Sequence, residues 1–297
     1  MINGTILESS AVALPATSLN MARRAMTSEE FERYRSVAMY RIVYASDGLR
    51  IHGYLALPGT YQDPLPAVMF NRGGIGPRGA LSDVGAAAYV ALYASWGYVS
   101  IASNYRGQGG SEGIEEFGGA DVNDAMNSLR VLEQLNYVDQ DRIGVVGGSR
   151  GGMITLMMLT RTNRFRAAVT FGAPTALHHE DKKSFIWKMM AKSLSDEATQ
   201  QADAQKRSAL TFADQLCKTT PLLLLHGTGD RRVAPEHSLL LAQELQKLQH
   251  PYKLIMYDNA DHVLAGRREE SNVDIRWWLD TYVFNKNPLP KTGPHGA

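Results

Sequence analysis

The sequence has a single cysteine, no long apolar run and almost no net charge, and each scarcity excludes a class of protein. One cysteine, Cys217, excludes an internal disulfide and a cysteine-rich zinc site. No stretch approaches the roughly 18 apolar residues of a membrane span, and Met1–Asn20 lacks the basic start of a secretory signal. Lys and Arg total 31 against 30 Asp and Glu, which argues against nucleic-acid binding. We expect a cytoplasmic protein with no nucleic-acid or membrane partner; the oligomeric state stays open.

The length of 297 residues and the apolar fraction of 44% are enough for one large domain with a substantial core. We expect this domain over residues 37–284, after a helical appendage at 1–36 and before a flexible, proline-containing tail at 285–297. The appendage pattern predicts one amphipathic helix within Met21–Arg35, with an N-cap at Thr27 or Ser28.

Short apolar runs alternate with helix-length segments along the rest of the chain. Two extended runs, Met39–Tyr44 and Ile51–Pro58, flank the turn signal Ser46-Asp47-Gly48 and predict a hairpin. Strands that are apolar throughout and alternate with helices predict an α/β fold, a mostly parallel sheet with helices on both faces. The segment at about 174–218 has no strand pattern, and we expect a helical insertion over the sheet. The other expected strands are 67–71, 98–104, 143–147, 167–171, 222–226 and 252–256, and the expected helices are 84–96, 120–135, 151–162, 235–248 and 273–284.

A G-x-S-x-G motif lies between an expected strand and an expected helix, with Ser149 at its centre. A serine held in a tight strand-to-helix turn needs neighbours without Cβ atoms, and the turn exposes its hydroxyl near the N-terminus of the helix. A glycine-rich turn with a solvated serine is the simpler alternative. A phosphate-binding loop is a poor alternative, because no Gly-Lys-Ser/Thr follows. The context predicts that Ser149 is a nucleophile.

A nucleophilic serine needs a histidine base, which in turn needs an orienting carboxylate. This type of fold supplies them in the order serine, acid, histidine, on loops that follow strands. Of the eight histidines, only His262 follows Ser149 on such a loop, and Asp230 follows the strand at 222–226. Asp258 and Asp261 are rival acids, but they lie so close to His262 along the chain that we expect them to form turns.

The tetrahedral intermediate of acyl transfer needs two N–H donors. We expect them from the backbone of Arg150, directly after the nucleophile, and of Gly74, in the glycine-rich loop after the strand at 67–71. The same loop matches the dinucleotide pattern G-x-G-x-x-G from Gly74 to Gly79. Pro77 interrupts that match, and no carboxylate for a ribose follows the next strand, so we predict no cofactor.

The insertion supplies apolar side chains that either line the acyl pocket or pack a helix onto the domain. The candidates for substrate contact are Phe185, Trp187 and Met190. The polar run His178-His179-Glu180-Asp181 is expected to be a solvated loop, because adjacent side chains point in different directions. We predict no metal site.

The sequence resembles the α/β-hydrolase catalytic domain of the prolyl oligopeptidase family from about Met39 to Phe284. The resemblance rests on five motifs: Arg72-Gly73-Gly74, Asn104-Tyr105-Arg106-Gly107, Gly147-Gly148-Ser149-Arg150-Gly151-Gly152, His226-Gly227-Thr228-Gly229-Asp230-Arg231-Arg232-Val233 and Asp261-His262. It implies a triad of Ser149, Asp230 and His262, an oxyanion hole at Gly74 and Arg150, and substrate contacts from Arg72 and Tyr105.

Two departures from the family pattern limit what the resemblance implies. The repeats of the β-propeller that usually precedes the peptidase domain are absent from this sequence. Arg72 replaces the usual His or Tyr, so the hydroxyl that a Tyr there can contribute to the oxyanion hole is absent. We therefore predict a serine hydrolase that cleaves an ester or a short-peptide bond. A dienelactone-hydrolase-type esterase and a non-catalytic binding protein on a hydrolase shell are the alternatives.

Overall fold

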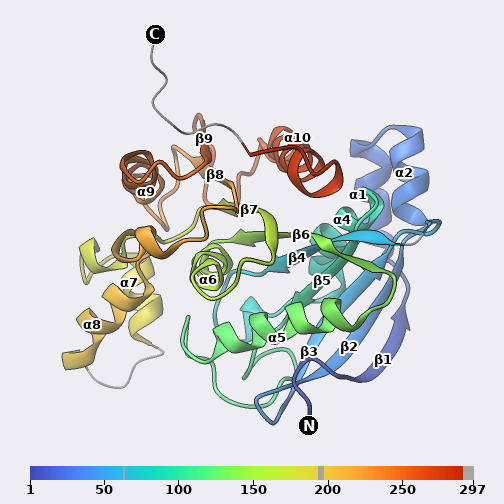
Figure 1. Ribbon diagram of the computed structural model, residues 1–297, viewed down its shortest axis with the longest axis horizontal. Helices are drawn as coiled ribbons and strands as arrows, with labels where there is room; N and C mark the ends of the chain where they lie inside the picture. The colour runs from blue at the N-terminus through green and yellow to red at the C-terminus, as the bar shows by residue number, and fades with distance from the viewer. Residues whose placement is uncertain (63, 193–196, 290–297) are drawn as a thin grey trace. The chain divides into compact units, whose positions relative to one another are not determined.

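The structure is a computed structural model that describes residues 1–62, 64–192 and 197–289 (Figure 1). It divides into two compact units. Unit 1 contains Met1–Glu115 and Ala120–Ile143, and unit 2 contains Glu116–Gly119 and Gly144–Ala297. The predicted insertion at 174–218 and the predicted tail at 285–297 each include residues outside the described ranges.

Unit 1 is built on an antiparallel meander followed by a parallel pair of strands, in the order β1-β2-β3-β5-β4. The predicted hairpin is confirmed, because β2 and β3 are antiparallel neighbours joined by a tight turn, with Ser46 paired to Leu49 next to that turn. Both turn residues, Asp47 and Gly48, have positive φ angles of 51° and 82°, as this tight hairpin turn requires. The strands are β1 (Ile6–Val12), β2 (Ala38–Ser46), β3 (Leu49–Leu57), β4 (Leu65–Asn71) and β5 (Val99–Ser103).

The first 36 residues differ from the predicted helical appendage in two ways. They begin with β1, which pairs along β2 as part of the unit 1 sheet. The prediction of one helix is wrong, because two helices form and Thr27 separates them. Thr27 is extended, with φ −61° and ψ 161°, and makes a reciprocal capping box with Glu30. The unit 1 helices are α1 (Ala16–Ala25), α2 (Ser28–Arg35), α3 (Asp83–Ala86), the π-helical turn η2 (Ala87–Ala91), α4 (Leu92–Ser95), α5 (Asp121–Gln134) and the 3₁₀ turn η1 (Pro77–Gly79).

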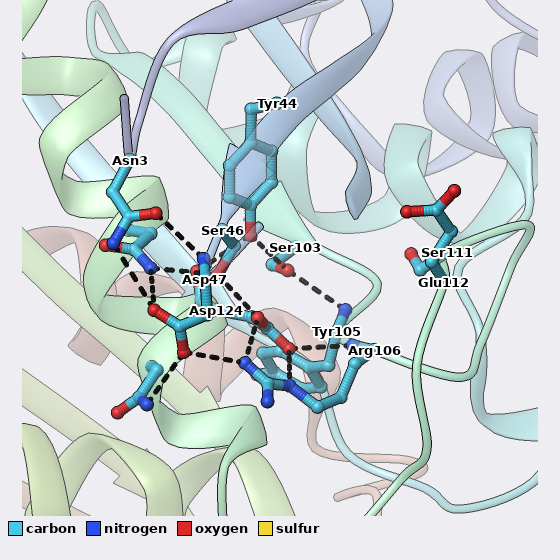
Figure 2. A network of polar contacts seen from close by, with 12 residues as sticks. Asn3, Tyr44, Ser46, Asp47, Ser103, Tyr105, Arg106, Ser111, Glu112 and Asp124 are labelled. Atoms are coloured by element: carbon cyan, nitrogen blue, oxygen red, sulfur yellow. Dashed lines mark hydrogen bonds and ion pairs between the residues drawn. The ribbon is translucent and has the colours of Figure 1, made fainter. Parts of the chain in front are cut away.

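A buried ion-pair network fixes the loop after β5 to the hairpin turn and to α5 (Figure 2). The Arg106 guanidinium donates from Nε and Nη2 to the carboxylate of Asp124, with both distances 2.9 Å. Asp124 also accepts from the Arg106 backbone N–H and from the hydroxyl of Ser46. Burial raises the pKa of the Asp124 carboxyl above its usual value, although the hydrogen bonds from Arg106 oppose this shift. The network therefore holds the start of this loop at a fixed position in unit 1.

Unit 2 has the strand order β6-β7-β8-β9, and β7, β8 and β9 are parallel. The helices α9 and α10 pack on it, α9 against β8 and β9 and α10 against β7 and β8 (Figure 1). Apolar strands covered by helices agree with the predicted α/β organisation. The elements are β6 (Val138–Gly148, of which Gly144–Gly148 lie in unit 2), α6 (Arg150–Leu159), β7 (Phe165–Phe171), β8 (Leu222–Gly227), α9 (Glu236–Lys247), β9 (Tyr252–Tyr257), α10 (Arg268–Leu279) and η6 (Asp280–Phe284).

The described part of the predicted insertion contains helical elements joined by turns and no strand, and α7 and α8 pack against each other (Figure 1). Its elements are η3 (Leu177–His179), α7 (Phe185–Ala191), α8 (Glu197–Arg207), η4 (Ala209–Thr211) and η5 (Ala213–Gln215). Over the described ranges of the whole chain, no helix has the length and apolar character needed to cross a membrane.

Candidate active site

Ser149 occupies a strained turn between the end of β6 and the start of α6. Its backbone has φ 52° and ψ −125°, a region that residues with a Cβ rarely adopt. Its N–H donates to the carbonyl of Phe171 on β7 at 2.8 Å, which ties the turn to the neighbouring strand. Such a conformation costs on the order of 1–3 kcal/mol and persists only where the surrounding structure enforces it. The turn is the nucleophile elbow that the G-x-S-x-G motif predicts.

The two glycines before Ser149 have no room for a Cβ atom. A Cβ at Gly147 would lie 2.3 Å from the carbonyl oxygen of Gly151, and one at Gly148 would lie 2.2 Å from the ring of Phe171. Strand β6 can approach α6 at Gly147 and the Phe171 ring of β7 at Gly148 only without those side chains. The motif therefore follows from the geometry of the turn that presents Ser149.

Three side chains predicted from distant parts of the sequence lie in one hydrogen-bonded chain within unit 2. His262 Nε2 is 2.9 Å from Ser149 Oγ, and His262 Nδ1 is 2.7 Å from Asp230 Oδ2. The ionised carboxylate only accepts, so Nδ1 carries the proton and Nε2 is free to accept the serine hydroxyl proton. This arrangement can move a proton from a serine to an imidazole and on to a leaving group.

Asp230 is held by donors on both of its carboxylate oxygens. Oδ1 accepts the backbone N–H groups of Arg232 and Val233 at 2.8 and 3.1 Å, and Oδ2 accepts from His262. Burial alone would raise the pKa of this carboxyl, but hydrogen bonds from His226 and His262 outweigh burial and lower the pKa well below its usual value. Asp230 is therefore ionised at neutral pH and can stabilise an imidazolium at His262.

The rival acids form turns, as predicted. Asp261 Oδ1 accepts the backbone N–H groups of Val263 and Ala265, and Asp258 accepts from the side chain of Asn259. His226 is a residue that the sequence reasoning missed: its Nε2 lies 3.1 Å from Asp230 Oδ2. Chain order excluded His226 as the base. Its position at the end of β8, four residues before the acid, was the available signal for a supporting role.

The two predicted oxyanion donors lie in different units, Arg150 in unit 2 and Gly74 in unit 1. Arg150 begins α6 directly after Ser149, so its backbone N–H belongs to the positive end of that helix. Gly74 lies in the loop after β4 with φ 77°, and a Cβ there would lie 2.7 Å from the Cα of Gly79. This contact explains the glycine-rich sequence of the loop. The assignment of both donors stays a prediction.

Arg72 and Tyr105 are corrected from substrate contacts to structural residues of unit 1. Both side chains are buried. Arg72 Nη1 donates to the carbonyl oxygen of Gly79 at 2.8 Å, and the Arg72 guanidinium lies 4.7 Å from the centre of the Tyr105 ring. Glu115 completes the brace, since it accepts the Gly76 N–H at 2.8 Å and lies 4.0 Å from the Arg72 guanidinium. Arg72 therefore fastens the loop that carries Gly74.

The three predicted pocket residues of the insertion differ in exposure. Phe185 is 49% exposed at the start of α7, and the guanidinium of Arg232 lies 5.8 Å from the centre of its ring. Trp187 and Met190 are buried, which favours the packing role for these two side chains. Of the three, Phe185 alone has a surface that a ligand can contact.

In the polar run at 178–181, His179 and Asp181 are exposed, as expected of a solvated loop, whereas Glu180 makes a contact within the unit. The carboxylate of Glu180 lies 2.6 Å from Nε2 of His237 on α9. Across the described ranges, no group of three or more His, Cys, Asp or Glu side chains is placed to hold a metal ion.

Fold and site together define an α/β hydrolase, because a nucleophile elbow and its hydrogen-bonded histidine and acid follow strands of an α/β sheet. Comparisons with known proteins agree. The structure matches a Mycobacterium tuberculosis puromycin-hydrolyzing peptidase with a TM-score of 0.72 at 23% identity, over 84% of this chain and 40% of that one. It matches an acylaminoacyl peptidase with a TM-score of 0.73 at 22% identity, over 86% of this chain and 43% of that one. At this level of identity the matches establish the α/β-hydrolase fold.

The sequence comparisons go further. The profile described as "Prolyl oligopeptidase family" matches residues 86–289. The uncharacterized peptidase YtmA of Bacillus subtilis is 33% identical over 252 residues, which is 82% of this chain and 93% of YtmA. Dipeptidyl aminopeptidase BIII of Pseudoxanthomonas mexicana is 28% identical over 77% of this chain, but the match spans only 36% of that enzyme. The chain belongs to the prolyl oligopeptidase family and is a serine hydrolase of the peptidase class.

Proposed function

We propose that this chain cleaves a short-peptide or small amide or ester bond through an acyl-enzyme formed on Ser149. His262 Nε2 takes the hydroxyl proton while Ser149 Oγ attacks the carbonyl carbon, and the protonated imidazole then gives that proton to the leaving group. Water, deprotonated by the same imidazole, attacks the acyl-enzyme; the acyl–oxygen bond breaks, the acid is released and the imidazolium returns its proton to Ser149 Oγ. The unbroken contacts of 2.9 and 2.7 Å from Ser149 through His262 to Asp230 carry the proposal.

Asp230 fixes the tautomer of the base in the proposed mechanism. Its ionised carboxylate accepts from Nδ1, so that Nε2 faces the serine as an acceptor, and its charge stabilises the imidazolium formed during attack. The backbone N–H of Arg150, at the start of α6, is the first proposed donor to the oxyanion. Gly74 is the second, and the family resemblance supports it.

Short peptides are the proposed substrates because the relatives carry peptidase names. YtmA, which this chain matches over 93% of its length, is an uncharacterized peptidase, and the Pseudoxanthomonas relative is a dipeptidyl aminopeptidase. An esterase without peptidase activity is the competing function, because the same triad chemistry cleaves both bonds. A panel of p-nitrophenyl esters beside aminoacyl and prolyl p-nitroanilides separates the two: turnover of esters alone would overturn the proposed peptidase activity.

The variant that tests the nucleophile is Ser149→Ala. We expect kcat on the best substrate to fall by roughly 10³-fold or more, since no other hydroxyl forms the acyl-enzyme. Ser128→Ala is the matched control, because Ser128 is a buried serine on α5, in unit 1, whose hydroxyl donates to the carbonyl of Ala125. Retention of most turnover by Ser149→Ala would refute the assignment. A protein that binds substrates without turning any over would support the binding-shell alternative.

A further inference from the structure

A second histidine contacts the catalytic carboxylate, on the same oxygen that the base contacts. His226, the next-to-last residue of β8, places its Nε2 3.1 Å from Asp230 Oδ2, the same oxygen that accepts from His262 Nδ1. Together with the two backbone donors on Oδ1, this gives Asp230 four hydrogen-bond donors. The carboxylate can therefore neither rotate nor slide without breaking several of these bonds.

The tautomer of His226 follows from its neighbours. The same Nε2 lies 3.1 Å from the carbonyl oxygen of Val233, and a carbonyl can only accept. Nε2 therefore carries a proton, which it shares between Val233 and Asp230. Nδ1 lies 2.6 Å from the hydroxyl of Ser238 in the first turn of α9. In the neutral imidazole Nδ1 accepts that hydroxyl proton, so α9 sets the orientation of the ring.

Burial excludes a direct role for His226 in the reaction. Its side chain has no exposed surface, whereas His262 is 10% exposed and reaches Ser149. A donor that reaches the carboxylate but not the substrate acts only through Asp230. Hydrogen bonds to a buried charge are strong and their loss is costly, because no water replaces them.

We propose that His226 is a positioning residue: through its Nε2 proton it holds Asp230 Oδ2 where His262 Nδ1 meets it, with Ser238 fixing the His226 ring. The inference rests on the proposed function of the triad. Because both imidazoles donate to the same carboxylate oxygen, His226 keeps that oxygen in place for His262 during proton transfer. Loss of the outer imidazole is expected to slow the chemical step and to leave substrate binding intact.

The test compares His226→Leu, which removes the donor, with His226→Gln, whose side-chain amide can supply an N–H near the position of Nε2. We expect His226→Leu to lower kcat by roughly 10- to 100-fold, the loss of one hydrogen bond to a charged group. KM should stay within about a factor of two, because the residue does not reach the substrate. The rate of Ser149 labelling by a fluorophosphonate should fall with kcat, and His226→Gln should recover part of both.

His250→Leu is the matched control in the same unit. His250 is also a buried histidine, 2% exposed, but its ring nitrogens lie 3.1 and 3.2 Å from the backbone carbonyl oxygens of Pro251 and Cys217. His250→Leu therefore carries the stability cost of replacing a buried imidazole, but it removes no contact to Asp230. We expect kcat of His250→Leu to equal that of the wild type at temperatures below its melting point.

Three outcomes overturn the inference. They are a kcat for His226→Leu equal to that of His250→Leu, an equal loss in His226→Leu and His226→Gln at equal melting temperature, or a rise in KM in place of the fall in kcat. If His226→Leu does not fold, Ser238→Ala decides, since it keeps the imidazole and removes its anchor. A fall in kcat of a few-fold supports the inference, and an unchanged kcat refutes it. Ser149→Ala, measured alongside, separates this result from a failure of the proposed function, because an active Ser149→Ala would overturn the triad itself.

Discussion

Replacement of Asp230 by Asn tests the electrostatic half of the site, because it changes one atom and keeps the shape of the side chain. Oδ2 accepts from His262 Nδ1 at 2.7 Å and from His226 Nε2 at 3.1 Å. If the new NH₂ group takes that position, two donors lose their acceptor. At about 1.5–3 kcal/mol for each hydrogen bond to a charged group, the loss is about 3–6 kcal/mol. This corresponds to a fall in kcat of roughly 10²- to 10⁴-fold.

Rotation of the Asn side chain does not avoid the cost. With the amide oxygen turned toward the histidines, the NH₂ group faces the backbone N–H groups of Arg232 and Val233, which lose their acceptor. In the first orientation His262 is also driven to the other tautomer, whose Nε2 proton points at Ser149 and cannot accept from it. We therefore expect the loss in kcat with little change in KM, measured on the best substrate of the panel.

Asp258→Asn is the control, because Asp258 accepts from the side chain of its neighbour Asn259 and precedes His262 on the same loop. An Asp230→Asn enzyme within tenfold of the wild type would refute this account of the acid. An equal loss in Asp258→Asn would do the same.

Two further predictions concern stability, and a third concerns labelling of the turn that carries Ser149. The pKa of Asp230 is depressed in the folded state, so the contribution of this carboxylate to folding stability is present above the unfolded value of about 3.9 and is lost as pH falls through the folded pKa. The melting temperatures of the wild type and of Asp230→Asn should therefore converge on acidification. A constant difference between them would contradict this. Asp124→Ala should cost about 3–5 kcal/mol in denaturant unfolding, because the mostly buried Arg106 loses its bidentate partner and keeps only the carboxylate of Asp47. A loss no larger than that of Glu29→Ala, at an exposed ion pair, would argue against the network. Gly147→Ala should abolish fluorophosphonate labelling, because its Cβ would lie 2.3 Å from a backbone oxygen. Gly85→Ala in α3, the control, should label normally. Equal labelling of the two variants would show that the nucleophile elbow tolerates a side chain at Gly147.

The sequence was most informative where a local pattern and a physical demand coincide. Short-range constraints determine the apolar strands, the hairpin turn at Asp47-Gly48 and the elbow at Ser149, and such constraints can be recognised in the local sequence. The triad followed from the chain order and from the rule that loops after parallel strands meet at one edge.

The errors have local and tertiary causes. The predicted N-cap at Thr27 is confirmed, but the pattern did not show that a separate helix, α1, already ends at Ala25 before it. Arg72 was predicted to contact the substrate. In the structure its guanidinium instead donates to the backbone carbonyl oxygens of Gly79 and Asn104. The sequence analysis missed His226, because chain order identifies the base but gives no information on a second imidazole that contacts the acid.

The most direct measurement is the position of the covalent adduct after treatment of the protein with a fluorophosphonate. Peptide mass spectrometry of the labelled wild type should place the adduct on Ser149, and His262→Ala should label at least two orders of magnitude more slowly, since the hydroxyl then has no base. An adduct on a different serine of an active enzyme, or labelling of Ser149 at the same rate without His262, would contradict the account.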